Sequence, residues 1–268
     1  AWLMLIPKKR LAPADRKGHP QLVVTLTSYG RRASKTVPHV LSSLLVQTKR
    51  PDRIILWLDD VNFSSSCLPK RLADMRDNYG IEVRFCEDIR SYKKLIPTLQ
   101  KYPNATIVTI DDDVMYDLDF LEKLVNSHKS IPNVVFSNRI HRMKLDENNM
   151  PIGYMDWDWC VNKYDESKLN FLTGVGGVLY PPHVLPNEVF NESVFMDICK
   201  FADDVWFNAM LLLNNVPIVK SYTNSIYGQD YIEISEVQYV GLCHENTYRN
   251  DIQLKNVWSR YQINQKIT

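Results

Sequence analysis

Short apolar runs alternate with helical patterns along the first half of the chain. These runs are rich in β-branched and other apolar residues, as is typical of strands buried in a sheet, and they cover residues 21–27, 53–58, 81–86, 105–110 and 133–136. Apolar residues at helical spacing predict helices around residues 37–45, 68–75 and 118–125. Strands that alternate with helices predict an α/β fold with a mostly parallel sheet covered on both faces.

The pattern changes after residue 138. Residues 138–172 are polar and aromatic without a clean helical period, which predicts a β-rich insertion or a long loop forming one wall of a cleft. Regular structure is expected again in residues 171–180, in a helix over residues 203–214 and in a strand at 216–220. The tail from Tyr222 is polar and weakly patterned, so we expect it to wrap around the domain.

Composition excludes some classes of protein. The 268 residues include 32 Lys and Arg against 31 Asp and Glu, a formal net charge of +1, which disfavours nucleic-acid binding through bulk charge. Apolar residues make up 45% and charged residues 24%, as in ordinary globular domains rather than disordered chains.

Several features bear on where the protein works. The five cysteines are scattered and include no CxxC pair, which argues against a disulfide scaffold or a zinc knuckle and fits a reducing compartment. The apolar run at residues 2–6 is far shorter than the ~20 residues of a membrane-spanning helix. The chain does not begin with Met, which indicates processing or trimming that could have removed an anchor. We expect a cytoplasmic protein, and peripheral association with the inner face of the cytoplasmic membrane stays open.

Three consecutive carboxylates, Asp111, Asp112 and Asp113, directly follow the run at 105–110. In open α/β sheets the carboxyl ends of parallel strands face the ligand crevice. Like charges repel there unless a cation neutralises them, and alternation along an extended segment turns Asp111 and Asp113 toward one side. We therefore favour a divalent cation site completed by diphosphate oxygens over an acidic turn that caps the helix beginning near Asp117.

A second acidic pair, Asp203 and Asp204, opens the predicted helix at 203–214. Either acid could cap that helix, because the helix dipole favours negative charge at its N-terminus. In a chain that also carries a metal site, one carboxylate would suit a general base that removes a proton from an acceptor hydroxyl.

Three weaker signals accompany the acids. The glycines of residues 173–177 would let the backbone approach a ligand, although a strand bulge is an equal explanation. Lys93 and Lys94 precede the fourth strand, and the ammonium group of either could meet phosphate. Lysines of this kind are more commonly exposed on the surface of a helix. His244 follows both acidic motifs, but a single His is more often structural than a ligand.

Together these segments resemble bacterial glycosyltransferases of the GT-A fold, in a branch related to the family 2 transferases of surface-polysaccharide synthesis. The segments that carry the resemblance are VTLTSYGRR, RIILWLDD, SYKKLIPTLQ, TIVTIDDDVMY, FLTGVGGVLYPP and ADDVWF. The resemblance runs from about Gln21 to about Pro217, with a weaker echo at His244. It implies a Rossmann-like GT-A sheet with an acceptor-side insertion. The expected division is an N-terminal extension (1–20), a catalytic domain (21–221, with a nucleotide half at 21–137 and an acceptor half at 138–221) and a C-terminal wrapping segment (222–268).

The resemblance also implies roles for the donor side. The expected nucleotide-sugar-binding residues are Thr27, Ser28, Tyr29, Asp59 or its neighbour Asp60, Asp111 and Asp112. We include Lys93 among them, because its ammonium group could meet phosphate. For Mn²⁺ or Mg²⁺, Asp113 is the expected direct ligand, Asp111 lies nearer the ribose, and His244 completes the metal shell.

On the acceptor side, the acidic pair matches the catalytic-base motif of these enzymes, with Asp204 favoured over Asp203. The glycine segment implies that Gly176 and Gly177 contact the acceptor. The aromatic stretch around Trp157 and Trp159 would suit a stacking wall for an acceptor sugar, and we assign Trp157 to it, although core packing explains either tryptophan at least as well.

The implied activity is metal-dependent transfer of a sugar from a nucleoside-diphosphate sugar, expected to be a UDP-hexose, to a hydroxyl of a glycan or lipid-linked glycan. Direct displacement with an Asp base would invert the anomeric configuration. Two alternatives stay open: a sugar nucleotidyltransferase and a non-catalytic carbohydrate- or nucleotide-binding module on the same fold. A haloacid-dehalogenase-like phosphatase is disfavoured, because it needs Thr or Val where Met115 stands.

Overall fold

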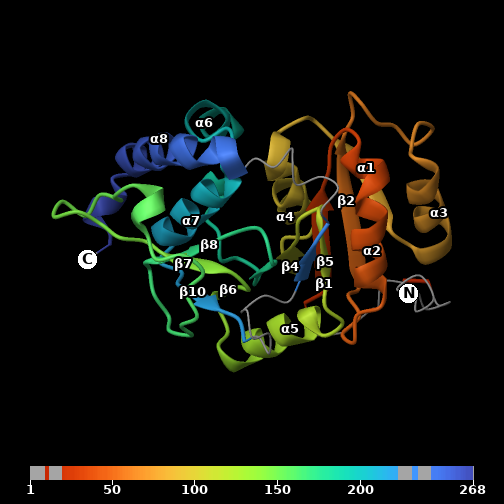
Figure 1. The fold of residues 1–268 in the computed structure, drawn as a ribbon, viewed down its shortest axis with the longest axis horizontal. Coiled ribbons are helices and arrows are strands. Elements are labelled where there is room, and N and C mark those ends of the chain that lie inside the picture. Colours follow the sequence, from red (N-terminus) through yellow and green to blue (C-terminus); the bar gives the residue numbers. More distant parts are fainter. Residues whose placement is uncertain (1–9, 12–19, 223–230, 235–242, 268) are drawn as a thin grey trace.

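The computed structural model describes residues 10–11, 20–222, 231–234 and 243–267. In the last of these ranges, side chains are described from residue 249 onward. Its centre is a seven-stranded sheet (Figure 1). In spatial order the strands are β10 (Ile218–Lys220), β6 (Val135–Ser137), β9 (Val178–Tyr180), β4 (Thr106–Thr109), β1 (Leu22–Thr27), β2 (Arg53–Asp59) and β3 (Glu82–Cys86). Only β9 runs antiparallel to its neighbours β4 and β6, so the prediction of a mostly parallel central sheet is confirmed.

Helices cover both faces of this sheet, because successive side chains of each strand point to opposite faces. Val24 of β1 belongs to the core under α2 (Val37–Leu45), α3 (Lys70–Tyr79) and α5 (Phe120–Ser130). Val23 belongs to the core on the other face, which is covered by the short helix η2 (Arg90–Lys94), α4 (Ile96–Lys101), α6 (Glu192–Ile198), α7 (Asp203–Leu213) and α8 (Cys243–Tyr261). The short helix α1 (Arg32–Lys35) leads into α2. Among the described residues, no helix has the length and apolar character needed to cross a lipid bilayer.

The second half of the chain departs from simple strand and helix alternation. Between β6 and β9 lies an insertion that contains the short helix η3 (Tyr154–Asp156) and a two-stranded sheet of β7 (Ile140–Arg142) and β8 (Asn170–Leu172). It combines the short sheet and the long loops that the sequence pattern left as alternatives. A further two-stranded sheet joins β5 (Val114–Tyr116) to β11 (Tyr231–Glu233). Strands of three residues are too short for their alternation to stand out in the sequence.

The tail contains a long helix that its polar composition did not predict. Helix α8 packs against α7 through a narrow stripe formed by Leu254, Val257 and Trp258, which are all buried. The Trp258 Nε1 donates a hydrogen bond to the Asn149 carbonyl at 3.2 Å, which ties the tail to the insertion. Polar residues on the other sides of α8 conceal this stripe in the sequence. Two further short helices are η4 (Asn187–Phe190) and η6 (Ile263–Gln265).

Candidate active site

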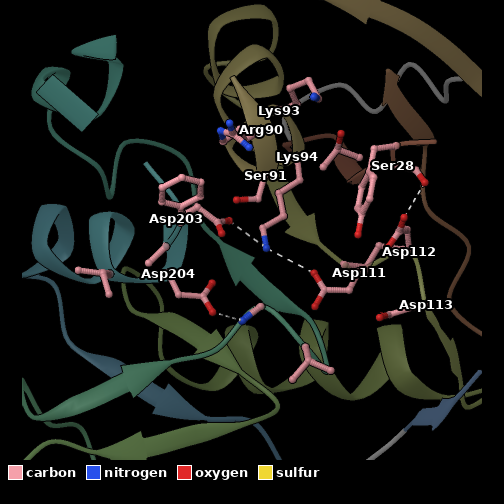
Figure 2. A pocket seen from close by; sticks show the side chains of 18 of the residues that line it. Ser28, Arg90, Ser91, Lys93, Lys94, Asp111, Asp112, Asp113, Asp203 and Asp204 are labelled. Atoms are coloured by element: carbon pink, nitrogen blue, oxygen red, sulfur yellow. Dashed lines mark hydrogen bonds and ion pairs between the residues drawn. The ribbon is translucent and has the colours of Figure 1, made fainter. Parts of the chain in front are cut away.

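A cleft of about 580 Å³ opens where the parallel strands β1 and β4 end. The loop after β1 contributes Ser28, and the segment after β4 contributes the three consecutive aspartates, as expected at the carboxyl edge of an open α/β sheet. The start of α7, the segment around Gly174 and the helix η2 complete the walls (Figure 2). The cleft therefore brings together both acidic motifs, which are far apart in the sequence.

The loop after β1 and helix α1 hold the acidic segment in place. The Ser28 Oγ donates a hydrogen bond to the Asp112 Oδ2 at 2.5 Å. The Arg32 Nη1 lies 2.9 Å from the Asp112 Oδ1 and 3.0 Å from the Asp113 Oδ2. These contacts turn Asp112 toward the β1 loop, whereas Asp111 faces the middle of the cleft (Figure 2).

Burial destabilises the ionised forms of these acids. It raises the pKa of Asp112, against the opposing charge of Arg32. Burial, followed by the charges of Asp111 and Asp112, raises the pKa of Asp113 to about 6, and Arg32 again opposes the shift. One guanidinium thus does not fully compensate the adjacent carboxylates. A further cation in the cleft would stabilise their ionised forms.

Lys94 connects the two acidic motifs. Its Nζ lies 2.9 Å from the Asp203 Oδ2 and 3.4 Å from the Asp111 Oδ1, and its side chain is only 8% exposed. Burial acts to lower the pKa of Lys94, but the surrounding carboxylates outweigh this effect and raise that pKa well above its usual value. The ammonium group is therefore charged at neutral pH. It holds the first turn of α7 against the segment that follows β4 (Figure 2).

Gly174 makes room for this contact. A Cβ atom at this position would lie 2.6 Å from the Lys94 Nζ, 3.2 Å from the Asp204 Oδ1 and 3.4 Å from the Asp111 Oδ1. The buried ammonium is held by two carboxylates, so it could not move away without breaking an ion pair. The absence of a side chain at Gly174 is thus a condition for the two acidic motifs to meet.

Asp204 has the properties of a proton acceptor. Its Oδ2 accepts a hydrogen bond from the Gly174 N–H at 2.9 Å, and its Oδ1 is buried with no hydrogen-bond partner among the described residues. Burial raises the pKa of Asp204 to about 7, opposed by the charge of Lys94 and assisted by that of Asp203. A pKa near neutrality suits a general base. The carboxylate of Asp203 is instead engaged by Lys94, so the geometry favours Asp204 for this role.

Trp159, rather than Trp157, reaches the cleft. Trp157 is 4% exposed and packs against Tyr154 and Phe171 in the core. Trp159 is 40% exposed, lines the cleft and lies with its ring centroid 4.6 Å from that of His141. Burial lowers the pKa of His141 to about 4, so the imidazole that packs against Trp159 is neutral at physiological pH.

Most of the residues expected from the sequence meet in this cleft. Those that line it are Thr27, Ser28, Tyr29, Lys93, Asp111, Asp112, Asp113, Asp203 and Asp204. The expected residues that are not among the lining residues are Asp59 and its alternative Asp60, Gly176, Gly177 and Trp157. Asp59 accepts hydrogen bonds from the backbone and side-chain nitrogens of Asn62 at 2.7 and 2.8 Å, and a Cβ at Gly177 would lie 2.5 Å from the Phe120 ring. The side chain of His244, in the first turn of α8, lies outside the described residues.

Sequence reasoning missed several basic residues of the cleft. Arg32, Arg90 and Arg139 all line it. Arg32 stands in the SYGRR segment that carries the nucleotide loop, and Arg90 directly precedes SYKK. A useful signal was available: six acids expected in one site require compensating cations, and basic residues inside the same motifs are the first candidates.

The described residues fit a divalent cation site that substrate oxygens would complete. Asp111 and Asp113 both line the cleft, and a cation would relieve the unfavourable ionisation of Asp113. Within the described ranges, no group of three or more His, Cys, Asp or Glu residues is placed to hold a metal ion. Mg²⁺ is commonly held by one or two carboxylates together with phosphate oxygens and water, so two carboxylates are sufficient.

Comparison with solved structures identifies the fold. The chain superposes on the crystal structure of S. aureus TarS 1–349 with a TM-score of 0.51 and 14% identity, over 82% of this chain and 62% of that one. For the longer TarS structure the TM-score is 0.49 with 14% identity, over 81% of this chain and 37% of that one. For TarS 1–349 in complex with UDP it is 0.48 with 13% identity, over 79% and 59%.

The chain thus spans less than two thirds of each of these structures. No protein-family model and no curated protein matches it. At this identity the likeness concerns the fold alone, which is mixed α/β and GT-A-like.

Proposed function

We propose that this protein is a glycosyltransferase that moves a sugar from a nucleoside-diphosphate sugar to an acceptor hydroxyl. The observation that carries the proposal is the single cleft in which the acids after β4 face Asp203 and Asp204 at the start of α7. The GT-A-like fold supports the same assignment. A UDP-hexose is the expected donor, and a glycan or lipid-linked glycan is the expected acceptor.

The donor would occupy the side of the cleft formed by the ends of β1 and β4. Ser28 and Tyr29 would contact the nucleotide, and Asp111 and Asp113 would lie beside its diphosphate. Mn²⁺ or Mg²⁺ bound by these two acids would act as a Lewis acid that neutralises charge on the departing nucleoside diphosphate. Arg32 holds the acidic segment in position through its contacts with Asp112 and Asp113.

The acceptor hydroxyl would be placed against Asp204. As its oxygen forms a bond with C1 of the donor sugar, the bond from C1 to the diphosphate oxygen breaks and the hydroxyl proton passes to the Asp204 Oδ1, which no described residue hydrogen-bonds. One displacement from the face opposite the leaving group would invert the anomeric configuration. Lys94 pairs with the neighbouring Asp203 and fixes α7 relative to the donor side.

A donor screen tests this function. Release of nucleoside diphosphate from a panel of sugar nucleotides is measured with Mn²⁺, with Mg²⁺ and with a chelator. We expect release from one donor that requires the metal, and a loss of at least about 100-fold in Asp113→Ala, because metal stabilisation of the leaving group contributes several kcal/mol. Asp119→Ala is the matched control, since Asp119 lies outside the cleft lining and pairs with Lys123 on α5.

Other results of the screen would contradict the proposal. Pyrophosphate release from a nucleoside triphosphate would assign a sugar nucleotidyltransferase. Tight nucleotide binding without turnover, independent of metal, would assign a binding module.

Replacing Trp159 by Ala should raise the KM for the acceptor about fivefold and leave the affinity for the donor unchanged. The exposed ring on the cleft wall offers a stacking surface, and such contacts contribute about 1 kcal/mol. Steady-state kinetics with varied acceptor provides the measurement. Trp157→Phe is the control, because that side chain is buried and its change should affect stability but not KM. An unchanged acceptor KM in Trp159→Ala would remove the ring from the acceptor site.

A further inference from the structure

Arg32 contacts the carboxylate that the proposed function assigns to a divalent cation. Its Nη1 lies 3.0 Å from the Asp113 Oδ2 and 2.9 Å from the Asp112 Oδ1. Among the described residues, no other side chain hydrogen-bonds Asp113 or pairs with it. A divalent cation bound to the same carboxylate would lie close to the guanidinium, and the two positive charges would repel each other. Arg32 and the cation therefore compete for Asp113.

The environment of this contact makes the competition strong. The Arg32 side chain is 11% exposed and that of Asp113 is 20% exposed, so water screens their charges less than at an open surface. An arginine does not lose its proton at any working pH, so deprotonation offers no relief. The repulsion persists until the guanidinium moves or gains an anion beside it.

Arg32 has hydrogen-bond donors left for such an anion. Only its Nη1 contacts the acids, whereas its Nε and Nη2 make no hydrogen bond with the other described residues. The guanidinium is a planar fork of five N–H donors that fits two oxygens of a phosphate. Arg32 lines the cleft together with Tyr29, whose ring centroid lies 5.3 Å from the guanidinium carbon. One side chain can thus contact both the acids and a diphosphate beside them.

The acidic segment is built to lose one of its two contacts with Arg32. The Ser28 Oγ donates a hydrogen bond to the Asp112 Oδ2 at 2.5 Å, so Asp112 keeps a partner when the guanidinium turns (Figure 2). Asp113 has no second side-chain partner in the described part of the chain. A turn of the guanidinium toward a diphosphate would therefore release Asp113 and leave Asp112 held.

The other cation beside an expected metal ligand is held differently. The Lys94 Nζ lies 3.4 Å from the Asp111 Oδ1 but only 2.9 Å from the Asp203 Oδ2, and its side chain is 8% exposed. The space that it fills is the one left by Gly174. Lys94 cannot turn without leaving a buried carboxylate, so of these two cations Arg32 is the one able to respond to the donor.

We propose that Arg32 couples cation binding to donor binding. It keeps a divalent cation away from Asp113 until the donor diphosphate arrives, and its free N–H groups then contact the diphosphate while Asp113 turns to the cation. Cation and donor consequently bind cooperatively, and neither binds tightly alone. The diphosphate half of this inference rests on the proposed function, whereas the competition for Asp113 can be tested without any nucleotide.

The experiment measures two affinities. Binding of Mn²⁺ is followed by the electron paramagnetic resonance signal of the free ion, without nucleotide and with saturating UDP, and binding of UDP is followed by calorimetry at saturating Mn²⁺. In the wild type, UDP should raise the Mn²⁺ affinity at least about tenfold. Arg32→Gln should bind Mn²⁺ alone about tenfold more tightly and UDP at saturating Mn²⁺ about tenfold more weakly. A merely structural role would weaken both.

Three further variants locate the effect. Arg31→Gln removes the neighbouring exposed charge, outside the cleft lining, and should change neither affinity. Asp113→Asn, added to Arg32→Gln, should abolish the gain in Mn²⁺ affinity, because the ion then lacks the released carboxylate. Arg32→Lys keeps the charge without the fork, so it should bind Mn²⁺ alone as weakly as wild type and UDP more weakly. Thermal unfolding checks each fold, and Arg32→Lys still decides the diphosphate contact if Arg32→Gln does not fold.

The inference is overturned if Arg32→Gln binds Mn²⁺ alone no more tightly than wild type, if the gain persists without the Asp113 carboxylate, or if UDP binding at saturating Mn²⁺ is unchanged in both Arg32 variants. In each case metal-dependent nucleotide binding by the wild type would leave the proposed function intact. If the wild type binds none of UDP, GDP, CDP and ADP, the proposed function fails together with the diphosphate half, and the Mn²⁺ titration without nucleotide still decides the competition for Asp113.

Discussion

Replacement of Asp204 by Asn should lower kcat about 10³-fold while the affinity for the sugar nucleotide stays within about twofold of wild type. The amide keeps the size of the carboxylate and can still accept the hydrogen bond that the Gly174 N–H donates at 2.9 Å. It cannot take the proton of the acceptor hydroxyl. Single-turnover kinetics and a direct binding measurement with the donor separate these two effects. A kcat close to wild type would show that another group accepts the proton.

The pH dependence of the wild-type enzyme checks the same assignment. Because burial raises the pKa of Asp204 to about 7, and only the ionised carboxylate accepts a proton, kcat/KM should rise with pH through about 7. The residual activity of Asp204→Asn should lack this limb. A wild-type profile that is flat between pH 5.5 and pH 8.5 would contradict the assignment, because these two values lie about 1.5 units on either side of that pKa.

Stability provides a control for folding in the same variant. The pKa of Asp204 in the folded protein is raised above its ordinary value of 3.8, so its contribution to stability is present below about pH 4 and is lost as pH rises through about 7. At pH 8 the ionised carboxylate therefore disfavours the folded state. Asp204→Asn should consequently unfold at pH 8 at a temperature no lower than wild type. Lost activity combined with unchanged or higher stability would place the residue in the chemistry.

The second large effect is expected for Lys94→Met, which should lower the free energy of unfolding at pH 8 by about 3–5 kcal/mol. The change leaves the buried Asp203 and the partly buried Asp111 without the cation that lies 2.9 Å from the first and 3.4 Å from the second. Urea unfolding at pH 8 and pH 5 provides the measurement. The loss should be smaller at pH 5, because Asp113 and Asp204, whose pKa values are about 6 and 7, are then largely protonated and repel their neighbours less.

Lys93→Met is the matched control for this experiment. Lys93 is also buried, but it pairs with Asp88, whose side chain is 51% exposed, so the water-accessible carboxylate can remain solvated when its partner is lost. We expect a loss of about 1 kcal/mol or less with little dependence on pH. Equal losses in the two variants would show that Lys94 acts only as a buried side chain and not as the link between the acidic motifs.

The sequence by itself determined the central sheet and the place of the acids. The strands β1, β2 and β4 come from continuous apolar runs, and such runs have few alternatives to burial in a parallel sheet. Once the run at 105–110 is a strand of that sheet, Asp111 to Asp113 must lie at its carboxyl edge. The position of the sheet strands and of these acids follows from chain direction and hydrophobic burial, which are local properties. The order of residues therefore predicts both.

Only the tertiary structure decided which side chains meet. Lys94 contacts Asp203 across the cleft because Gly174 leaves space between them, and Arg32 reaches Asp112 because α1 begins beside the acidic segment. Each contact depends on the packing of elements that are distant in sequence, and a residue's own neighbours carry no record of that packing.

The tryptophans and the tail show the same division. Trp157 and Trp159 are two positions apart and equally aromatic, yet the first is buried and the second lines the cleft. Helix α8 is polar except for a narrow stripe, and only its contact with α7 shows what that stripe covers. Burial is a property of the surface that a side chain meets, so the sequence gives the chemical type of each residue and the packed structure decides which of them face the cleft.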